Sequence, residues 1–305
     1  MNDLDLLKLR FAGLSTQQIH RLLRFSPSFM KYSKVDKQYI LKQFLGTVKI
    51  TAKNENVYRL YVTTNLEVLF KQLKAWKVHF ITINHRLYPQ LLREIYDPPL
   101  ILFYRGKLTL MQSPRTLAII GSRQATQYTW QSLQTFFPSF KKHHLTIISG
   151  LAKGADMMAH QHALLFKLPT IAVLGFGHMH HYPKETKEIR QQIEKDGIVI
   201  SEYLPLEKPK RYHFPERNRL ISGLSKGIFI TESAENSGTS ITTRFALEQN
   251  RDVYVLPGTI FNKMTLGNLR SAQEGAKIVL NADDILEDFI TVSYTHLTLP
   301  TNREV

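Results

Sequence analysis

The chain of 305 residues contains no cysteine. A disulfide framework and zinc sites built from thiolates are therefore excluded, and the composition is typical of a reducing compartment. The sequence also lacks the roughly 18 consecutive apolar residues of a membrane span, and charged residues interrupt its first ten positions at Asp3, Asp5, Lys8 and Arg10. We therefore expect a soluble, cytoplasmic protein with no contact to a membrane.

Signatures of catalysis and of cofactor binding are missing as well. No Gly-Lys-Ser/Thr triplet occurs, no Gly-x-Gly-x-x-Gly fingerprint occurs, and the spacing identifies no serine nucleophile with a histidine partner. Gly175-Phe176-Gly177 lacks the third glycine and the helix start of a dinucleotide site. We expect no catalytic residue and no cofactor.

Histidines are the one residue type that raises the question of a metal. His160 and His162 are two positions apart and so do not share a helix face, and no nearby set of carboxylates completes a ligand set for the histidines, which also include His178, His180 and His181. We therefore expect no metal site.

Acidic residues are scarce relative to basic ones, which gives a net charge of +15. Residues 1–110 hold 18 Lys and Arg against 7 Asp and Glu, whereas residues 111–290 hold 21 against 17. A basic surface of this kind is more often a solvated face than a specific site, so the bulk charge only weakly supports binding of a polyanion. The placement of individual arginines must decide the matter.

The chain divides into three parts by its hydrophobic pattern. Residues 1–76 show helical spacing, with Ser15 as a helix cap, and predict a small helical domain. Residues 77–290 begin with two strand patterns near 79–83 and 100–104 and continue as alternating strands and helices. Residues 291–305 fit neither period, and we expect a disordered tail or a segment added by cloning.

The alternating region predicts an α/β fold, with a mainly parallel sheet and helices on both of its faces. We place its apolar strands at 117–120, 145–148, 170–174, 197–200, 227–231, 252–255 and 277–280. Helical patterns lie between them near 126–141, 154–166, 184–195, 217–223, 240–249 and 268–274. In such sheets a ligand lies beyond the carboxyl ends of the strands.

Three turns at these strand ends have the composition of an anion site. Glycines allow close approach of the backbone, helix N-termini present N–H groups, and arginine or lysine grips phosphate. The predicted contacts are Gly121, Ser122 and Arg123 in the first turn, Ser149, Gly150, Lys153 and Gly154 in the second, and Ser237, Gly238 and Thr239 in the third. Taken singly, each turn could also be an ordinary helix start, with Asp156 or the threonines as caps.

A fourth segment, residues 208–219, combines cations with aromatic residues. We predict phosphate contacts from Arg211, Arg217, Asn218 and Arg219, and base stacking on Phe214 or Tyr212. Such a combination suits a single strand, because the bases of an unpaired strand are open to stacking. The alternative interpretation is a basic surface loop with Phe214 in the core.

These blocks, in this order, resemble the DNA-processing protein A family, known as DprA or Smf. The resemblance covers roughly residues 80–285 and is carried by Gly121-Ser122-Arg123, residues 149–156, Tyr182-Pro183, Ser201-Glu202, residues 214–219, residues 237–242, Pro257-Gly258 and Glu274-Gly275-Ala276. It departs from the family at Ser271, Ala272 and Gln273, and the winged-helix domain of some members is expected to be missing after residue 290.

The resemblance implies an extended Rossmann-like domain that binds single-stranded DNA. It also implies protection of incoming DNA during natural transformation, loading of the recombinase RecA, and a homodimer. By the same resemblance, Arg123 and Arg211 contact DNA, Phe214 stacks a base, and residues 1–76 form a sterile-alpha-motif-like or helix-hairpin-helix-like module.

Two other functions stay open at this point. One is a Rossmann-like nucleotide phosphoribohydrolase of the lysine-decarboxylase-like group, in which Glu235 or Glu248 would be the active carboxylate. The other is a structural adaptor that binds a protein partner through the basic N-terminal third.

Overall fold

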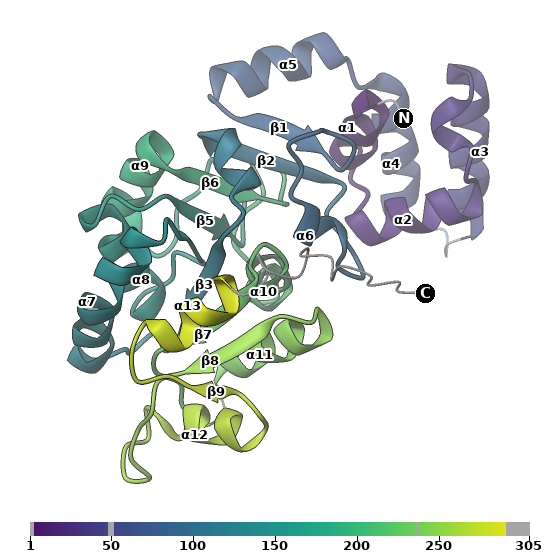
Figure 1. Ribbon diagram of the computed structural model, residues 1–305. Helices are drawn as coiled ribbons and strands as arrows, with labels where there is room; N and C mark the ends of the chain where they lie inside the picture. The colour runs from purple at the N-terminus through teal and green to yellow at the C-terminus, as the bar shows by residue number, and fades with distance from the viewer. Residues whose placement is uncertain (1–2, 48–51, 236, 291–305) are drawn as a thin grey trace, which may run out of the picture.

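The computed structural model describes residues 3–47, 52–235 and 237–290, and shows a large sheet with a group of helices at one edge (Figure 1). The tail predicted for residues 291–305 lies outside the described residues. Among the residues that are described, no helix is both long enough and apolar enough to cross a bilayer.

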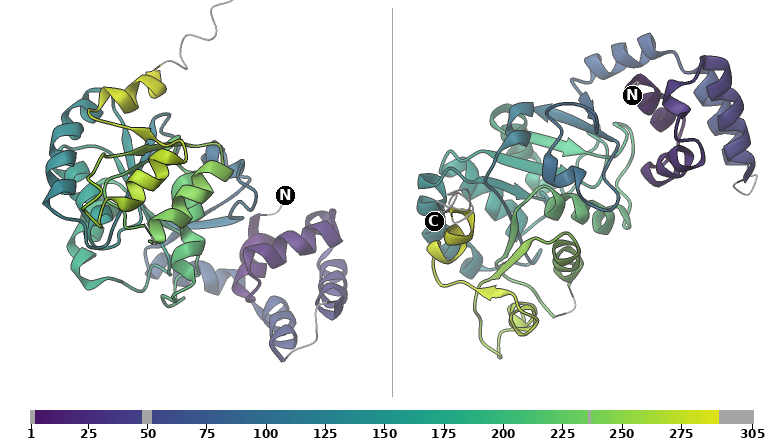
Figure 2. Two further views of the ribbon diagram at one scale, coloured as in Figure 1. Left: turned by 90° about the horizontal axis from the view of Figure 1, so that it is seen from below. Right: turned by 45° about the vertical axis from the view of Figure 1, so that its right-hand side comes forward.

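The N-terminal part consists of helices, as the sequence predicts. They are α1 (Asp3–Phe11), α2 (Thr16–Phe25), η1 (Phe29–Lys31), α3 (Lys34–Thr47), α4 (Ala52–Thr63) and α5 (Leu66–Ala75). Ser15 and Gln18 form a capping box that starts α2, and Asn65 caps α5. Both views of Figure 2 show these helices gathered at one end of the molecule.

The sheet has nine strands in the order β1-β2-β6-β5-β4-β3-β7-β8-β9. These are β1 (His79–Thr82), β2 (Ile101–Gly106), β3 (Thr116–Ile120), β4 (Thr146–Ser149), β5 (Thr170–Leu174), β6 (Ile198–Ser201), β7 (Gly227–Ile230), β8 (Asp252–Val255) and β9 (Lys277–Ile278). β3 to β9 pair in parallel, whereas β1 and β2 add an antiparallel edge. The mainly parallel sheet predicted from the sequence is therefore confirmed.

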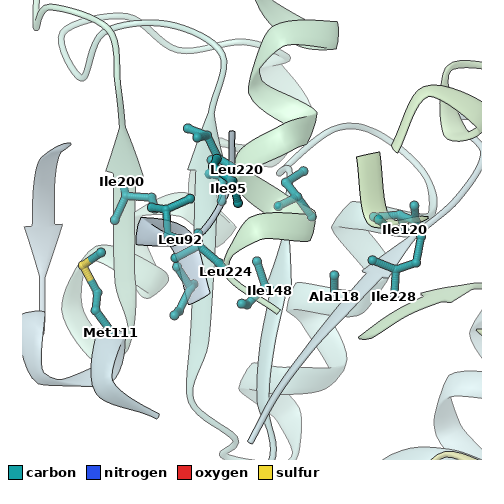
Figure 3. Close-up of a cluster of buried hydrophobic side chains, with 14 of the residues drawn as sticks. Leu92, Ile95, Met111, Ala118, Ile120, Ile148, Ile200, Leu220, Leu224 and Ile228 are labelled. Atoms are coloured by element: carbon teal, nitrogen blue, oxygen red, sulfur yellow. The ribbon is translucent and has the colours of Figure 1, made fainter. Parts of the chain in front are cut away.

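Helices cover both faces of this sheet. One face carries α7 (Gln127–Lys142), α8 (Ala155–Leu165), η3 (Lys184–Thr186), α9 (Lys187–Asp196) and α13 (Asp283–Ile290). The other carries α6 (Gln90–Arg93), η2 (Leu108–Gln112), α10 (His213–Gly223) and α11 (Gly238–Glu248), while α12 (Leu266–Gln273) packs beside β8. Side chains of each strand alternate between the two faces, so that Ala118 and Ile148 contribute to the core under α10 (Figure 3).

The strand order places a topological switch between β3 and β7. From β3 the chain moves outward through β4 and β5 to β6, and it then returns through α10 to β7 on the other side of β3. Connections leave these two adjacent strands toward opposite faces, which opens a crevice at their carboxyl ends.

Several elements of the structure differ from the boundaries predicted from the sequence. α10 begins at His213 rather than near 217, because Pro215 fits the first turn of a helix, where its missing N–H is not needed. β9 ends at Ile278, two residues before the predicted end of the strand at position 280. α13 has no counterpart in the helical patterns listed above.

The helical part and the sheet share one hydrophobic core. Leu100, Ile101 and Phe103 at the β2 edge belong to the same buried cluster as the leucines of α1 and α2. The predicted division at residue 76 marks a change of secondary structure, and the apolar packing continues across it.

A buried polar cluster around Glu202 ties the same two parts together. The Glu202 carboxylate accepts hydrogen bonds from Thr16 Oγ1 of α2 and from Arg219 Nη2 of α10, each at 2.5 Å. Arg219 also forms an ion pair with Asp97 at 3.3 Å and donates to the Asp97 carbonyl oxygen at 2.8 Å. The Arg219 guanidinium is therefore the charged partner of both the Asp97 and the Glu202 carboxylate.

Replacing Arg219 with alanine is expected to destabilise the protein by about 3–5 kcal/mol, because it leaves the buried Glu202 carboxylate without its charged partner. Urea unfolding followed by circular dichroism measures the effect. The matched control is Arg244→Ala, which removes an exposed pair with Glu248 on α11 and should cost about 0.5 kcal/mol or less. Equal stability of the two variants would contradict this account of the cluster.

Candidate nucleic-acid interface

A cavity of about 560 Å³ lies at the switch between β3 and β7. The strand ends and helix starts that surround it contribute Gly121, Ser122, Arg123, Ala152, Asp156, Phe214, Arg217, Asn218, Ser237, Gly238, Thr239 and Thr242, among others. We call it the central cavity. The first, third and fourth of the predicted segments therefore contribute predicted residues to this cavity. The second segment contributes Ala152 and Asp156, which the sequence did not predict as contacts.

The turn after β3 is held by a buried carboxylate. Glu232, fully buried after β7, accepts hydrogen bonds from the Thr126 backbone and hydroxyl at 2.6 and 2.9 Å and from the Thr129 hydroxyl at 2.7 Å. The Ser122 N–H donates to the Glu232 carbonyl oxygen at 2.6 Å. A negative charge is favourable here because it lies at the N-terminus of α7. Arg123 is left exposed at the tip of the turn.

The loop after β4 packs directly against this turn. Gly154, with φ of +74°, begins α8, and the Ala155 N–H donates to the Ser122 carbonyl oxygen at 3.0 Å. A β-carbon at Gly154 would collide with the backbone of Ser122 and Arg123. Glycine is thus required by both the backbone angle and the space.

Two buried groups of opposite charge, Arg217 and Asp156, lie beneath this loop. Arg217 is only 4% exposed, donates to the Val173 carbonyl oxygen at 2.6 Å, and packs its guanidinium against Gly150. Burial lowers the pKa of Arg217, and the charge of Asp156 opposes that change. Burial raises the pKa of the Asp156 carboxyl, and Arg217 opposes the rise. The pair forms part of the wall of the central cavity.

The central cavity continues outward past Arg123 and Phe214. A small side cavity adds Gly150 and Lys153, and an outer cavity of about 390 Å³ adds Pro209, Lys210 and Arg211; Tyr182 borders both. Arg123 and Phe214 line all three, so we treat the three cavities as one groove. The Arg123 guanidinium carbon lies 5.7 Å from the centre of the Phe214 ring, which is cation–π distance.

Lys153 is a predicted cation of the groove that forms an ion pair with a carboxylate. Its ammonium contacts the Glu185 carboxylate, and both side chains are about half exposed. The hydrogen bond from Lys153 lowers the pKa of Glu185. An anion that binds Lys153 would have to compete with this carboxylate.

Most predicted contacts reach the groove, but three do not line it among the described residues. The Ser149 hydroxyl is fully buried and donates to the Ile119 carbonyl oxygen at 2.7 Å. Gly154 serves the contact between two turns, as described above. Arg219 lies two positions after Arg217 on α10 and faces Glu202 instead, so the sequence-based assignment of Arg219 to phosphate is not supported by its position.

Two residues with clear structural roles were missed by the sequence reasoning. Glu232 follows a strand without any motif glycine, and only the fold brings it beneath the turn at Ser122. Tyr182 was noted only as part of the family pattern, and the structure places it at the groove. Phe214 is half-buried at the edge of the core. Tyr212 is not among the described residues that line the three cavities, and the Lys210 ammonium lies over its ring, 5.7 Å from the ring centre.

Two of the histidines considered as metal ligands, His160 and His178, are buried and hydrogen-bonded within the protein. His160 Nδ1 bonds to the Thr170 hydroxyl at 2.8 Å, and burial lowers the pKa of His160 to about 3, so that it stays neutral. His178 bonds to the Phe103 carbonyl oxygen at 3.1 Å. Within the part of the chain that the structure describes, no three His, Cys, Asp or Glu side chains are grouped as metal ligands would be.

Comparison with known proteins gives consistent matches. The family model for DNA recombination-mediator protein A matches residues 79–290. The DNA processing protein DprA of Bacillus subtilis is 39% identical over 283 residues, which cover 90% of this chain and 94% of that protein. The protein of the same name from Streptococcus pneumoniae is 36% identical over 290 residues, covering 95% of this chain and 99% of that one.

Solved structures agree with these sequence matches. An X-ray structure of DNA processing protein A from Streptococcus pneumoniae has a TM-score of 0.82 at 34% identity and covers 95% of this chain and 98% of its own. A structure of DNA processing protein A from Helicobacter pylori, described as having a unique single-stranded DNA binding mode, has a TM-score of 0.63 at 27% identity. It covers 70% of this chain and 97% of its own.

Substitution of Gly154 by alanine tests the contact between the two turns. We expect a loss of at least about 2 kcal/mol of unfolding free energy, because the side chain is strained by the positive φ and collides with the neighbouring backbone. The matched control is Gly238→Ala, which has open space around it and should stay within about 0.5 kcal/mol of the parent protein. Denaturant unfolding of both variants checks the result, and equal stabilities would refute the role of Gly154.

Proposed function

This chain belongs to the DNA recombination-mediator protein A family, and from that premise we propose that it binds single-stranded DNA along the groove. The observation that carries the proposal is the position of Arg123 over Phe214, where all three cavities of the groove meet. A cation therefore lies beside an aromatic face at this point. The cation can bind a phosphate of a single strand, and the ring can stack on one of its unpaired bases.

Each part of the groove has a separate task in this proposal. Arg123, Arg211 and Lys153 contact phosphates, and the start of α11 at Ser237, Gly238 and Thr239 adds N–H donors. Phe214 stacks a base. Arg217 is too deeply buried to grip a phosphate on the surface, and we assign it to the positive potential of the cavity wall.

A single strand suits this site better than a duplex. In a duplex the faces of the bases are stacked on one another, whereas an unpaired base can lie on Phe214. The single-stranded DNA binding mode named for the Helicobacter pylori relative supports the same choice.

Catalysis is less well supported than binding. Glu235 and Glu248, the carboxylates of the phosphoribohydrolase alternative, are exposed and pair with Arg270 and Arg244. Neither is among the described residues that line the central cavity. The carboxyl group that does reach that cavity, Asp156, is buried, and the charge of Arg217 opposes the rise of its pKa. Membership of a DNA-processing family also favours binding over the adaptor alternative.

We also propose a homodimer and a biological role for the site. Exposed apolar side chains occur on the segments next to the β9 edge strand, namely Ile260 and Phe261 before α12, Ile278 in β9 and Leu280 just after it. A short sheet edge with apolar neighbours is suited to pairing with a second copy. From the resemblance to the family we further propose that the protein acts in the cytoplasm, where it protects incoming DNA during transformation and loads RecA. Measuring RecA assembly on single strands that this protein coats would test the loading.

The double variant Arg123→Ala/Arg211→Ala tests the DNA site. Each lost phosphate contact should flatten the dependence of log affinity on log salt by about 0.7, so the pair should flatten it by about 1.4 and weaken binding at low salt. Fluorescence anisotropy of a labelled oligothymidylate across a salt series measures both quantities.

The control for this variant carries the same change of charge at the opposite end of the sheet. Lys141→Ala/Lys142→Ala removes two exposed cations from the end of α7 and should leave the salt slope unchanged. If both double variants lower the slope equally, net charge explains binding and the groove assignment is wrong. A folded Arg123→Ala/Arg211→Ala protein with the parent slope would contradict it as well.

Sedimentation over a range of protein concentrations tests the dimer. We expect Phe261→Glu, at a residue that is 89% exposed in the single chain, to shift the parent protein from dimer to monomer, because a carboxylate would be buried between two copies. Tyr96→Glu, at an exposed aromatic residue near α6, is the control and should leave the dimer intact. A parent protein that sediments as a monomer at all concentrations would rule the proposal out.

A further inference from the structure

The geometry points to Tyr182 as a second base-stacking residue, beside Phe214, for the nucleotide next to the one that Phe214 holds. The inference rests on the proposed binding of single-stranded DNA and extends it to a residue with no assigned role. It is carried by the exposure of Tyr182, its contacts, and the bracing of its loop.

Tyr182 combines exposure with a position at the groove. Its side chain is 49% exposed, and it lines the side and outer cavities together with Arg123 and Phe214. A tyrosine kept for packing alone would bury more of its ring. One face of this aromatic side chain is therefore available to a ligand in the groove.

The angle between the two rings decides how bases could bind. The ring centres of Tyr182 and Phe214 are 5.8 Å apart and their planes are tilted by 52°. Two rings in this arrangement cannot enclose one flat base between parallel faces. They can instead serve as separate platforms for two successive bases, which is how aromatic side chains hold single strands.

The loop that carries Tyr182 is braced by an arginine from α9. Arg190 donates to the His178 carbonyl oxygen at 2.7 Å and to the His180 carbonyl oxygen at 2.5 Å. The His180 ring in turn bonds to the Leu206 carbonyl oxygen at 2.9 Å. Because the backbone before Tyr182 is already ordered, little conformational entropy is lost when its ring meets a base.

The surroundings of Tyr182 also suit a nucleic acid. Arg123 lines both of these cavities, Lys153 lines the side cavity and Arg211 lines the outer one. These cations can hold the phosphates on either side of a stacked base. Tyr182 itself adds an aromatic face to these cavities and no cation. Tyr182 should therefore contribute to affinity through the base alone, which separates its effect from that of the cations.

The test compares oligothymidylate with an abasic strand of the same length, which keeps the phosphates and lacks the bases. Anisotropy titrations across a salt series use the full chain, Tyr182→Ala and Tyr182→Phe. Tyr182→Ala should weaken binding of oligothymidylate at least about fivefold with an unchanged salt slope, and should leave binding of the abasic strand within about twofold of the parent. Tyr182→Phe keeps the ring and should bind both strands as the parent does.

Tyr39→Ala is the matched control, since Tyr39 is an exposed tyrosine on α3 that lines none of the three cavities, and it should change neither titration. Tyr182→Trp gives a readout that does not depend on loss of the ring. Its emission, corrected for Trp76 and Trp130 with the parent protein, should be quenched by oligothymidylate more than by the abasic strand.

The possible failures are distinguishable. If Tyr182→Ala binds oligothymidylate like the parent, the stacking role is refuted while DNA binding stands. If it weakens both strands equally, Tyr182 acts through the shape of the loop and the inference is again wrong. A parent protein that binds neither strand would overturn the proposed function and this inference together.

Discussion

The close approach of two backbone turns is the constraint on which the rest of the site depends. The turn at Ser122 and the start of α8 are in direct contact because Gly154 has no side chain, and the Ala155 N–H satisfies the Ser122 carbonyl oxygen. Glu232 holds the same turn from below. Together these contacts fix where Arg123 leaves the backbone, and so where its guanidinium can meet the Phe214 ring.

Charge in this site is divided between an exposed layer and a buried one. Arg123 and Arg211 reach solvent, whereas Arg217 lies beneath the loop after β4 and offsets the Asp156 carboxyl. A buried pair of this kind adds little net stability, because desolvation opposes its attraction. It does position the loop: Gly150 rests on the guanidinium, and the Ala152 N–H donates to Asp156 at 3.4 Å.

Sequence patterns predicted the strands and most of the groove, because both follow from local rules. Apolar runs locate buried strands, and glycine-rich turns at their ends must meet at one edge of a parallel sheet. Which of Arg217 and Arg219 faces the central cavity could not be predicted in this way. The two side chains have the same chemistry, and only the direction of α10 turns one toward the central cavity and the other toward Glu202. Glu232 and Tyr182 likewise gain their roles from contacts between distant segments.

The shared core between the N-terminal helices and β2 bears on how the chain can be divided. The family match begins at residue 79, yet a fragment cut there would leave Leu100, Ile101 and Phe103 facing water and would remove Thr16 from the Glu202 carboxylate. Apolar surface uncovered beside an antiparallel sheet edge promotes self-association. The helices therefore act as a cover for this edge of the sheet, and the apolar packing of this chain extends beyond the region that the family model matches.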